Sequence, residues 1–170
     1  MPYAQPNTAA HDSQGLEYIE KPERPFVVHM AQWWFAHADP PTRIPHRSDF
    51  TPEAMPRALP NIWLMDVSEG PRGLEFYTRL WGTGCTQATG VDRTGVATGE
   101  DPERFGATAI PKWQRAYRRV FDTRQPTYFY NRLVEYGREF VLGEVGIFPF
   151  SRHSDNRVSI ILGIFDIIRE

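Results

Sequence analysis

The sequence predicts an α+β fold in a single domain. Three observations favour this class: five segments have the residue types and spacing of β-strands, tight-turn signals separate neighbouring segments, and an amphipathic helical segment lies between the second and third of them. The first two strands should form a hairpin and the last three a meander. The predicted strands are 62–67, 74–81, 127–136, 139–150 and 158–168.

Size and composition limit the classes of function. Of the 170 residues, 41% are hydrophobic and 14% aromatic, so the chain can bury a sizeable core. A net charge of −2 and the lack of a reader motif argue against nucleic acid and acidic membranes as partners. The single cysteine excludes an internal disulfide and suits a reducing compartment. Since no signal-peptide pattern or membrane-length apolar run is present, the expected location is cytoplasmic.

The chain should begin with a tail followed by a helix. Residues 1–24 are polar and contain several prolines, so we expect a mobile tail. A helix should occupy residues 25–39, because Pro25 suits the first helical position and Pro40–Pro41 cannot continue it. Apolar residues cover more than half of this helix, and some of them could pack against a partner helix. The candidate dimer surface is Met30, Trp33 and Trp34.

The remaining residues, 40–170, should form the single domain. A short helix is predicted at 51–55, with Thr51 as its N-cap. The second predicted strand ends at Gly82-Thr83-Gly84, where glycine lets the chain turn sharply into a short helical piece.

A longer helix is predicted at 107–123. Its basic face is expected to be a solvated surface, with an acidic partner as the alternative. The apolar stripe consists of Ile110, Trp113, Tyr117, Val120 and Phe121. The basic face consists of Lys112, Arg115, Arg118 and Arg119.

Four short blocks of the sequence together resemble a known family. They are 45–52 (PHRSDFTP), 59–67 (LPNIWLMDV), 77–83 (YTRLWGT) and 90–95 (GVDRTG). Their spacing resembles that of single-domain PAS-like proteins of alphaproteobacteria, which are mostly of unknown function. The resemblance covers roughly residues 30–168. It implies a PAS-like five-stranded antiparallel sheet with helices on one face and an N-terminal amphipathic helix.

The resemblance also implies a kind of function. PAS domains sense small ligands, redox state or light and pass the signal on through protein contacts. The chain is therefore expected to be a sensory or regulatory module, a homodimer with an unidentified signalling protein as partner and a small ligand as modulator. Haem is disfavoured because the helix 107–123 lacks histidine, and flavin photochemistry because Cys85 lacks the required motif and is better read as a small buried thiol. The cofactor is unknown, and no set of side chains has metal-ligand spacing.

Polar side chains on otherwise apolar strands indicate where a ligand could bind. Glu144 lies in the middle of a strand, where a buried carboxylate needs a partner. Arg79 is one candidate, and the pair either forms an ion pair on a solvated face or holds a polar group of a ligand. The aromatic residues are either cavity lining or core. The candidate pocket consists of Arg79, Trp113, Tyr117, Tyr128, Tyr130 and Glu144.

Two other functions stay open. A small cone-fold α+β enzyme of the isomerase or dehydratase type would need an acid–base pair, which Glu144 with Tyr128 or Tyr130 could supply. The position of the long helix after the second strand argues against that fold. A scaffold protein with a filled core would bind no ligand. No residue is assigned a catalytic role, and the chain is not expected to be an enzyme.

Overall fold

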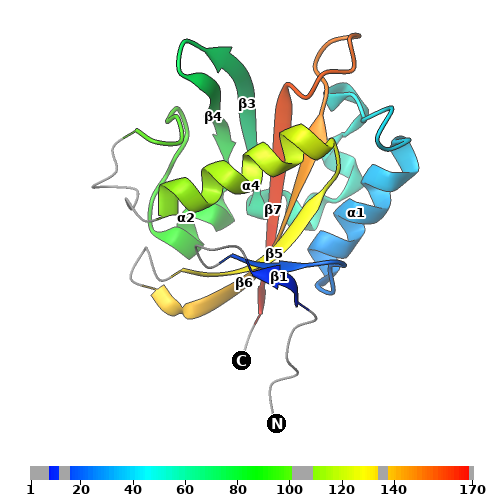
Figure 1. Ribbon diagram of the computed structural model, residues 1–170. Helices are drawn as coiled ribbons and strands as arrows, with labels where there is room; N and C mark the ends of the chain where they lie inside the picture. The colour runs from blue at the N-terminus through cyan, green and yellow to red at the C-terminus, as the bar shows by residue number, and fades with distance from the viewer. Residues whose placement is uncertain (1–7, 12–15, 101–108, 134–137, 169–170) are drawn as a thin grey trace.

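One antiparallel sheet of seven strands organises the fold (Figure 1). The computed structural model describes residues 8–11, 16–100, 109–133 and 138–168. Across the sheet the strands follow the order β1-β2-β5-β6-β7-β3-β4. The strands are β1 (Thr8–His11), β2 (Glu17–Ile19), β3 (Ile62–Gly70), β4 (Gly73–Trp81), β5 (Thr127–Leu133), β6 (Arg138–Phe150) and β7 (Ile160–Ile168).

The helices confirm the α+β class. In the described part of the chain, no helix is long and apolar enough to cross a membrane. The short helix predicted at 51–55 is the 3-10 helix η2, and residues 107–108 and 134–136 of the predicted elements lie outside the described ranges. The helices are α1 (Pro25–His37), α2 (Thr83–Thr89), α4 (Ala109–Thr123), η1 (Arg47–Asp49), η2 (Pro52–Ala54) and η3 (Pro56–Asn61).

The predicted N-terminal tail contributes two strands, so both the tail and the five-stranded sheet need correction. β2 pairs with β5, and its Tyr18 ring meets Phe129 edge-on at 6.0 Å. Leu16, Tyr18 and Ile19 are all buried, which explains why this segment joins the sheet. Residues 1–7 and 12–15 of the predicted tail lie outside the described residues.

Helices lie on both faces of the sheet, whereas the prediction placed them on one face. Successive residues of β6 point to opposite faces. Gly146 faces α1, because a side chain there would meet Val27. Val145 faces α4 and lines a cavity together with Trp113. We call these two sides the α1 face and the α4 face, and Figure 1 shows α4 crossing the sheet.

The predicted dimer surface on α1 is wrong, because its apolar residues pack on the protein's own sheet. Met30 and Trp34 are 0% exposed, and the Trp34 indole N–H donates to the Pro149 carbonyl at 2.9 Å. Trp33 is half-buried and its ring stacks on Phe150. The large hydrophobic side chain that α1 does expose is Phe35, at 50%. The helix also ends at His37, two residues before the predicted end.

The glycines after β4 serve close packing. Gly82 is the N-cap of α2 and has φ −61° and ψ 154°, which any residue can adopt. A side chain at Gly82 would overlap the Pro60 carbonyl, and one at Gly84 would overlap the Asn61 side chain. Glycine therefore lets α2 lie directly against η3, and this contact holds α2 beside the sheet.

Candidate functional site

The six predicted pocket residues do not lie together. Glu144, Tyr128 and Tyr130 share the α1 face, since Tyr130 is paired with Glu144 and Tyr128 with Gly146. Trp113 and Tyr117 lie on the α4 face, where their rings are 5.8 Å apart. Arg79 lies on β4 and is exposed. The sequence pattern shows which residues of one strand share a face, but not which strands are neighbours.

Arg79 pairs with Asp66, so the predicted pair with Glu144 is wrong. Its Nε lies 2.9 and 3.0 Å from the two carboxylate oxygens, and Arg152 binds the same carboxylate. β4 pairs with β3, whereas Glu144 lies on β6, three strands away. The hydrogen bond and charge of Asp66 raise the pKa of Arg79. Arg79 therefore belongs to a surface ion-pair cluster.

Glu144 anchors the start of α1. Its side chain is 0% exposed, and its two oxygens accept the backbone N–H groups of Glu23 at 2.9 Å and Arg24 at 2.8 Å. On the neighbouring strand, Asp166 accepts the N–H of Phe26 at 3.1 Å. These N–H groups at a helix start have no intrahelical acceptor. Burial raises the pKa of Glu144, and the two N–H bonds oppose that shift.

The two tyrosines of β5 are core residues. Both are 8% exposed, and the Tyr128 ring meets Phe148 edge-on at 5.9 Å. Burial raises the pKa of Tyr128, so its hydroxyl stays protonated at neutral pH. The acid–base pair suggested for an enzyme would combine this buried phenol with the Glu144 carboxylate. Both oxygens of that carboxylate already accept a backbone N–H, so the carboxylate serves the start of α1 in this structure.

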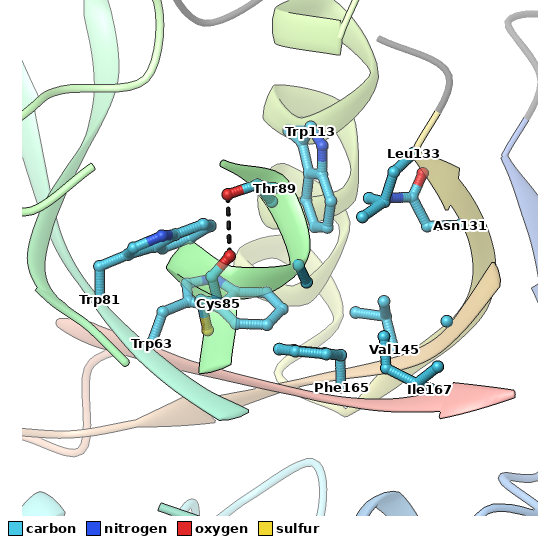
Figure 2. Close-up of a pocket in the computed structure, with 12 residues that line it drawn as sticks. Trp63, Trp81, Cys85, Thr89, Trp113, Asn131, Leu133, Val145, Phe165 and Ile167 are labelled. Atoms are coloured by element: carbon cyan, nitrogen blue, oxygen red, sulfur yellow. Dashed lines mark hydrogen bonds between the residues drawn. The ribbon is translucent and has the colours of Figure 1, made fainter. Parts of the chain in front are cut away.

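A small and mostly apolar cavity lies on the opposite face of the sheet (Figure 2). Its volume is ≈ 40 Å³, and of the six predicted residues only Trp113 lines it. We call it the α4-face cavity. It is lined by Trp63, Trp81, Cys85, Ala88, Thr89, Trp113, Asn131, Leu133, Gly143, Val145, Phe165 and Ile167.

Tryptophans form much of the wall of this cavity. The Trp63 ring lies 5.8 Å from Trp113 at 85°, and 5.7 Å from Trp81 at 51°. The Trp63 ring covers Gly163, where a side chain would overlap it. Its indole N–H donates to the Tyr117 hydroxyl at 3.0 Å, and that of Trp81 donates to the Val91 carbonyl at 2.9 Å. These hydrogen bonds fix both rings.

The third tryptophan has an unused donor. The Trp113 indole N–H is buried and finds no acceptor among the residues that the structure describes. Figure 2 shows this nitrogen on the side of the ring that faces Asn131 and Leu133. Asn131 is 4% exposed, and its Oδ1 accepts from Lys112 at 2.9 Å. The Thr89 hydroxyl is already bonded to the Cys85 carbonyl.

Cys85 is a buried thiol, as expected from the sequence. It is 1% exposed, and its Sγ lies 3.7 Å from the Ile62 carbonyl oxygen. Burial raises the pKa of this thiol to about 12, so the reactive thiolate is scarce at neutral pH. Within the described ranges, no group of three or more His, Cys, Asp or Glu side chains is placed to hold a metal ion.

Sequence reasoning missed most of this site because its lining comes from seven separate elements. One signal was available: Asn131 is a polar residue that shares a strand face with Phe129, and such a residue needs a reason to be buried. Comparisons with protein-family models, curated proteins and solved structures found no match to the chain. The PAS resemblance therefore rests on the four sequence blocks.

Proposed function

We propose that the chain is a PAS-like sensory or regulatory module, which acts through protein contacts and responds to a small ligand in the α4-face cavity. One observation carries this proposal. The strand β6 lines the cavity on one face with Gly143 and Val145, and on the other face its Glu144 holds the start of α1.

The alternation of β6 gives the proposal its mechanism. Glu144 stands between two cavity residues, and its carboxylate is bonded to the backbone of Glu23 and Arg24. A ligand that shifts β6 by a few tenths of an ångström would lengthen or shorten these charge-assisted bonds. Ligand binding would then shift the equilibrium between a docked and a loosened α1, provided that its affinity differs for the two states.

The arrangement of the long strands supports a PAS-like fold. An antiparallel sheet with its longest helix between β4 and β5 is what the resemblance implies. β1 and β2 extend the sheet beyond the five expected strands. α1 follows directly after them, and it lies against β6 and β7 on the face opposite α4.

The outer side of α1 is the proposed output surface. It exposes half of Phe35, while the other large apolar residues of the helix point inward. We propose that this side contacts a second copy of the chain in a homodimer or a signalling protein. The cytoplasmic location stays a prediction.

A thermal-shift screen of the full chain against a metabolite library tests the proposal. A ligand that binds only the native state, at a hundredfold excess over its dissociation constant, stabilises it by about 2.7 kcal/mol. We expect at least one compound to raise the Tm, and native mass spectrometry to detect it on the protein. A scaffold with a filled core would instead show no shift with any compound and no copurified ligand.

A further inference from the structure

We infer that the α4-face cavity binds a small uncharged molecule through a carbonyl-type oxygen, which accepts the hydrogen bond of the Trp113 indole N–H. This inference deepens the proposed function and rests on it. It specifies the chemical class of the ligand and the atom that recognises it.

The unused donor is the first part of the argument. Trp113 is 8% exposed, and its indole nitrogen has no acceptor among the described residues. A buried N–H without an acceptor costs free energy, which a ligand oxygen would recover. Because the nitrogen itself is covered by protein atoms, the Trp113 ring or a neighbouring lining side chain has to shift when the ligand oxygen binds. Trp63 and Trp81 line the same cavity, but their N–H groups are already bonded. Of these three tryptophans, Trp113 is therefore the one whose N–H needs an acceptor.

The lining determines the charge of the ligand. Every described residue that lines the cavity is uncharged, and most are aromatic or aliphatic. A carboxylate or ammonium group here would lose its hydration without gaining a counter-ion. An uncharged oxygen in an apolar molecule loses little hydration and fits the tryptophan walls.

The volume limits how much of the ligand is enclosed. The cavity measures ≈ 40 Å³, far below the roughly 150 Å³ of a dry cavity that holds benzene. The enclosed part is therefore the oxygen and the few atoms beside it. Cyclopentanone is a suitable probe, and methylenecyclopentane is its isostere without the oxygen.

An NMR titration of the full-length, ¹⁵N-labelled protein tests this inference. The Trp113 indole resonance is assigned with Trp113→Phe, which keeps an aromatic ring and removes the donor. We expect cyclopentanone to shift this resonance. We also expect it to bind about 2- to 10-fold more tightly than methylenecyclopentane, because one net hydrogen bond changes a dissociation constant by about this factor. Trp113→Phe should bind the two probes equally.

A second variant keeps the test valid if Trp113→Phe does not fold. A methyl group on Gly143 would make only ordinary contacts, at 3.8 Å or more, and would occupy the cavity. Gly143→Ala should weaken cyclopentanone binding at least 5-fold. The control is Gly70→Ala at the β3–β4 hairpin, where only the flexible end of Glu75 must move; it should bind like the wild type.

The outcomes separate this inference from the proposed function. Equal binding of both probes to the wild type would overturn the acceptor claim and leave a ligand-responsive module intact. Wild-type binding by Gly143→Ala would overturn the assignment of the site. If neither probe binds at millimolar concentration, the inference is wrong, and the metabolite screen then decides the proposed function independently.

Discussion

Glu144 on β6 accepts the backbone N–H of Arg24, the N-cap residue of α1, at 2.8 Å. The two residues are 120 positions apart in the chain, so this bond ties the N-terminal helix to the centre of the sheet. A carboxylate bound to N–H groups at a helix start also interacts favourably with the helix dipole. The structural role of Glu144 follows from this contact and leads to the first predictions.

Replacing Glu144 with Gln should destabilise the protein. An amide can accept one of the two N–H bonds, but its own NH₂ group then faces the second N–H. We expect a loss of about 1–3 kcal/mol in the free energy of unfolding, measured by urea denaturation. The control is Glu75→Gln, at an exposed position on β4, which should change the free energy of unfolding by less than about 0.5 kcal/mol. Equal stability of the two variants would contradict the anchoring role.

The contribution of Glu144 should depend on pH. Burial raises its folded-state pKa above the ordinary value of 4.5, so the folded protein holds this proton more tightly than the unfolded chain. The stabilisation that Glu144 contributes is then fully present below pH 4.5, and it is lost as the pH rises through the raised folded-state pKa.

Thermal unfolding of the wild type and Glu144→Gln between pH 4 and 8 measures this dependence. The stability of the wild type relative to the variant should increase as the pH falls from neutral. A constant difference, or one that increases toward high pH, would show that the N–H bonds outweigh burial and that the pKa is not raised.

Two glycines of β6 should respond differently to alanine. A methyl group on Gly146 would lie 2.8 Å from both Val27 and Phe148, so α1 would have to move. We expect Gly146→Ala to cost about 1–3 kcal/mol by overpacking. Gly143→Ala on the same strand is the matched control and should cost less than about 1 kcal/mol. A Gly146→Ala protein as stable as Gly143→Ala would mean that α1 is not packed against this strand.

Phe35 should control self-association if α1 forms the dimer. Light scattering of the wild type at tens of micromolar should give the mass of a dimer. Phe35→Asp places a charge on this surface without entering the core, so it should weaken the dimer at least tenfold. Gln32→Glu, also exposed on α1, is the control for charge alone. A monomeric wild type would refute the homodimer.

Local pattern predicted the parts of the fold that depend on local physics. Strands β3 to β7 and α4 were found because their apolar residues repeat with the period of the element, as Trp113, Tyr117 and Val120 do. β2 was missed because three residues give too short an alternation to recognise. Its stability comes from burying Tyr18 against a strand more than a hundred residues later.

The candidate site depends on which strands are neighbours, and that information is not local. The positions of Arg79 and Glu144 suggested a pair, but β4 and β6 are separated by β7 and β3. Trp113 lines a cavity, whereas its helix stripe alone left open whether it was cavity lining or core. Asn131 and Gly143 join it only because β5 and β6 pair in the register that sets these two residues opposite each other.

Amide hydrogen exchange at Glu23 and Arg24 tests the central claim, that the α4-face cavity communicates with α1 through β6. Their N–H groups are bonded to a buried carboxylate and should exchange slowly in the free protein. With the cavity saturated by cyclopentanone, or by a compound from the screen, we predict at least a threefold change in both exchange rates. Unchanged rates, while the Trp113 indole resonance reports a filled cavity, would contradict the claim.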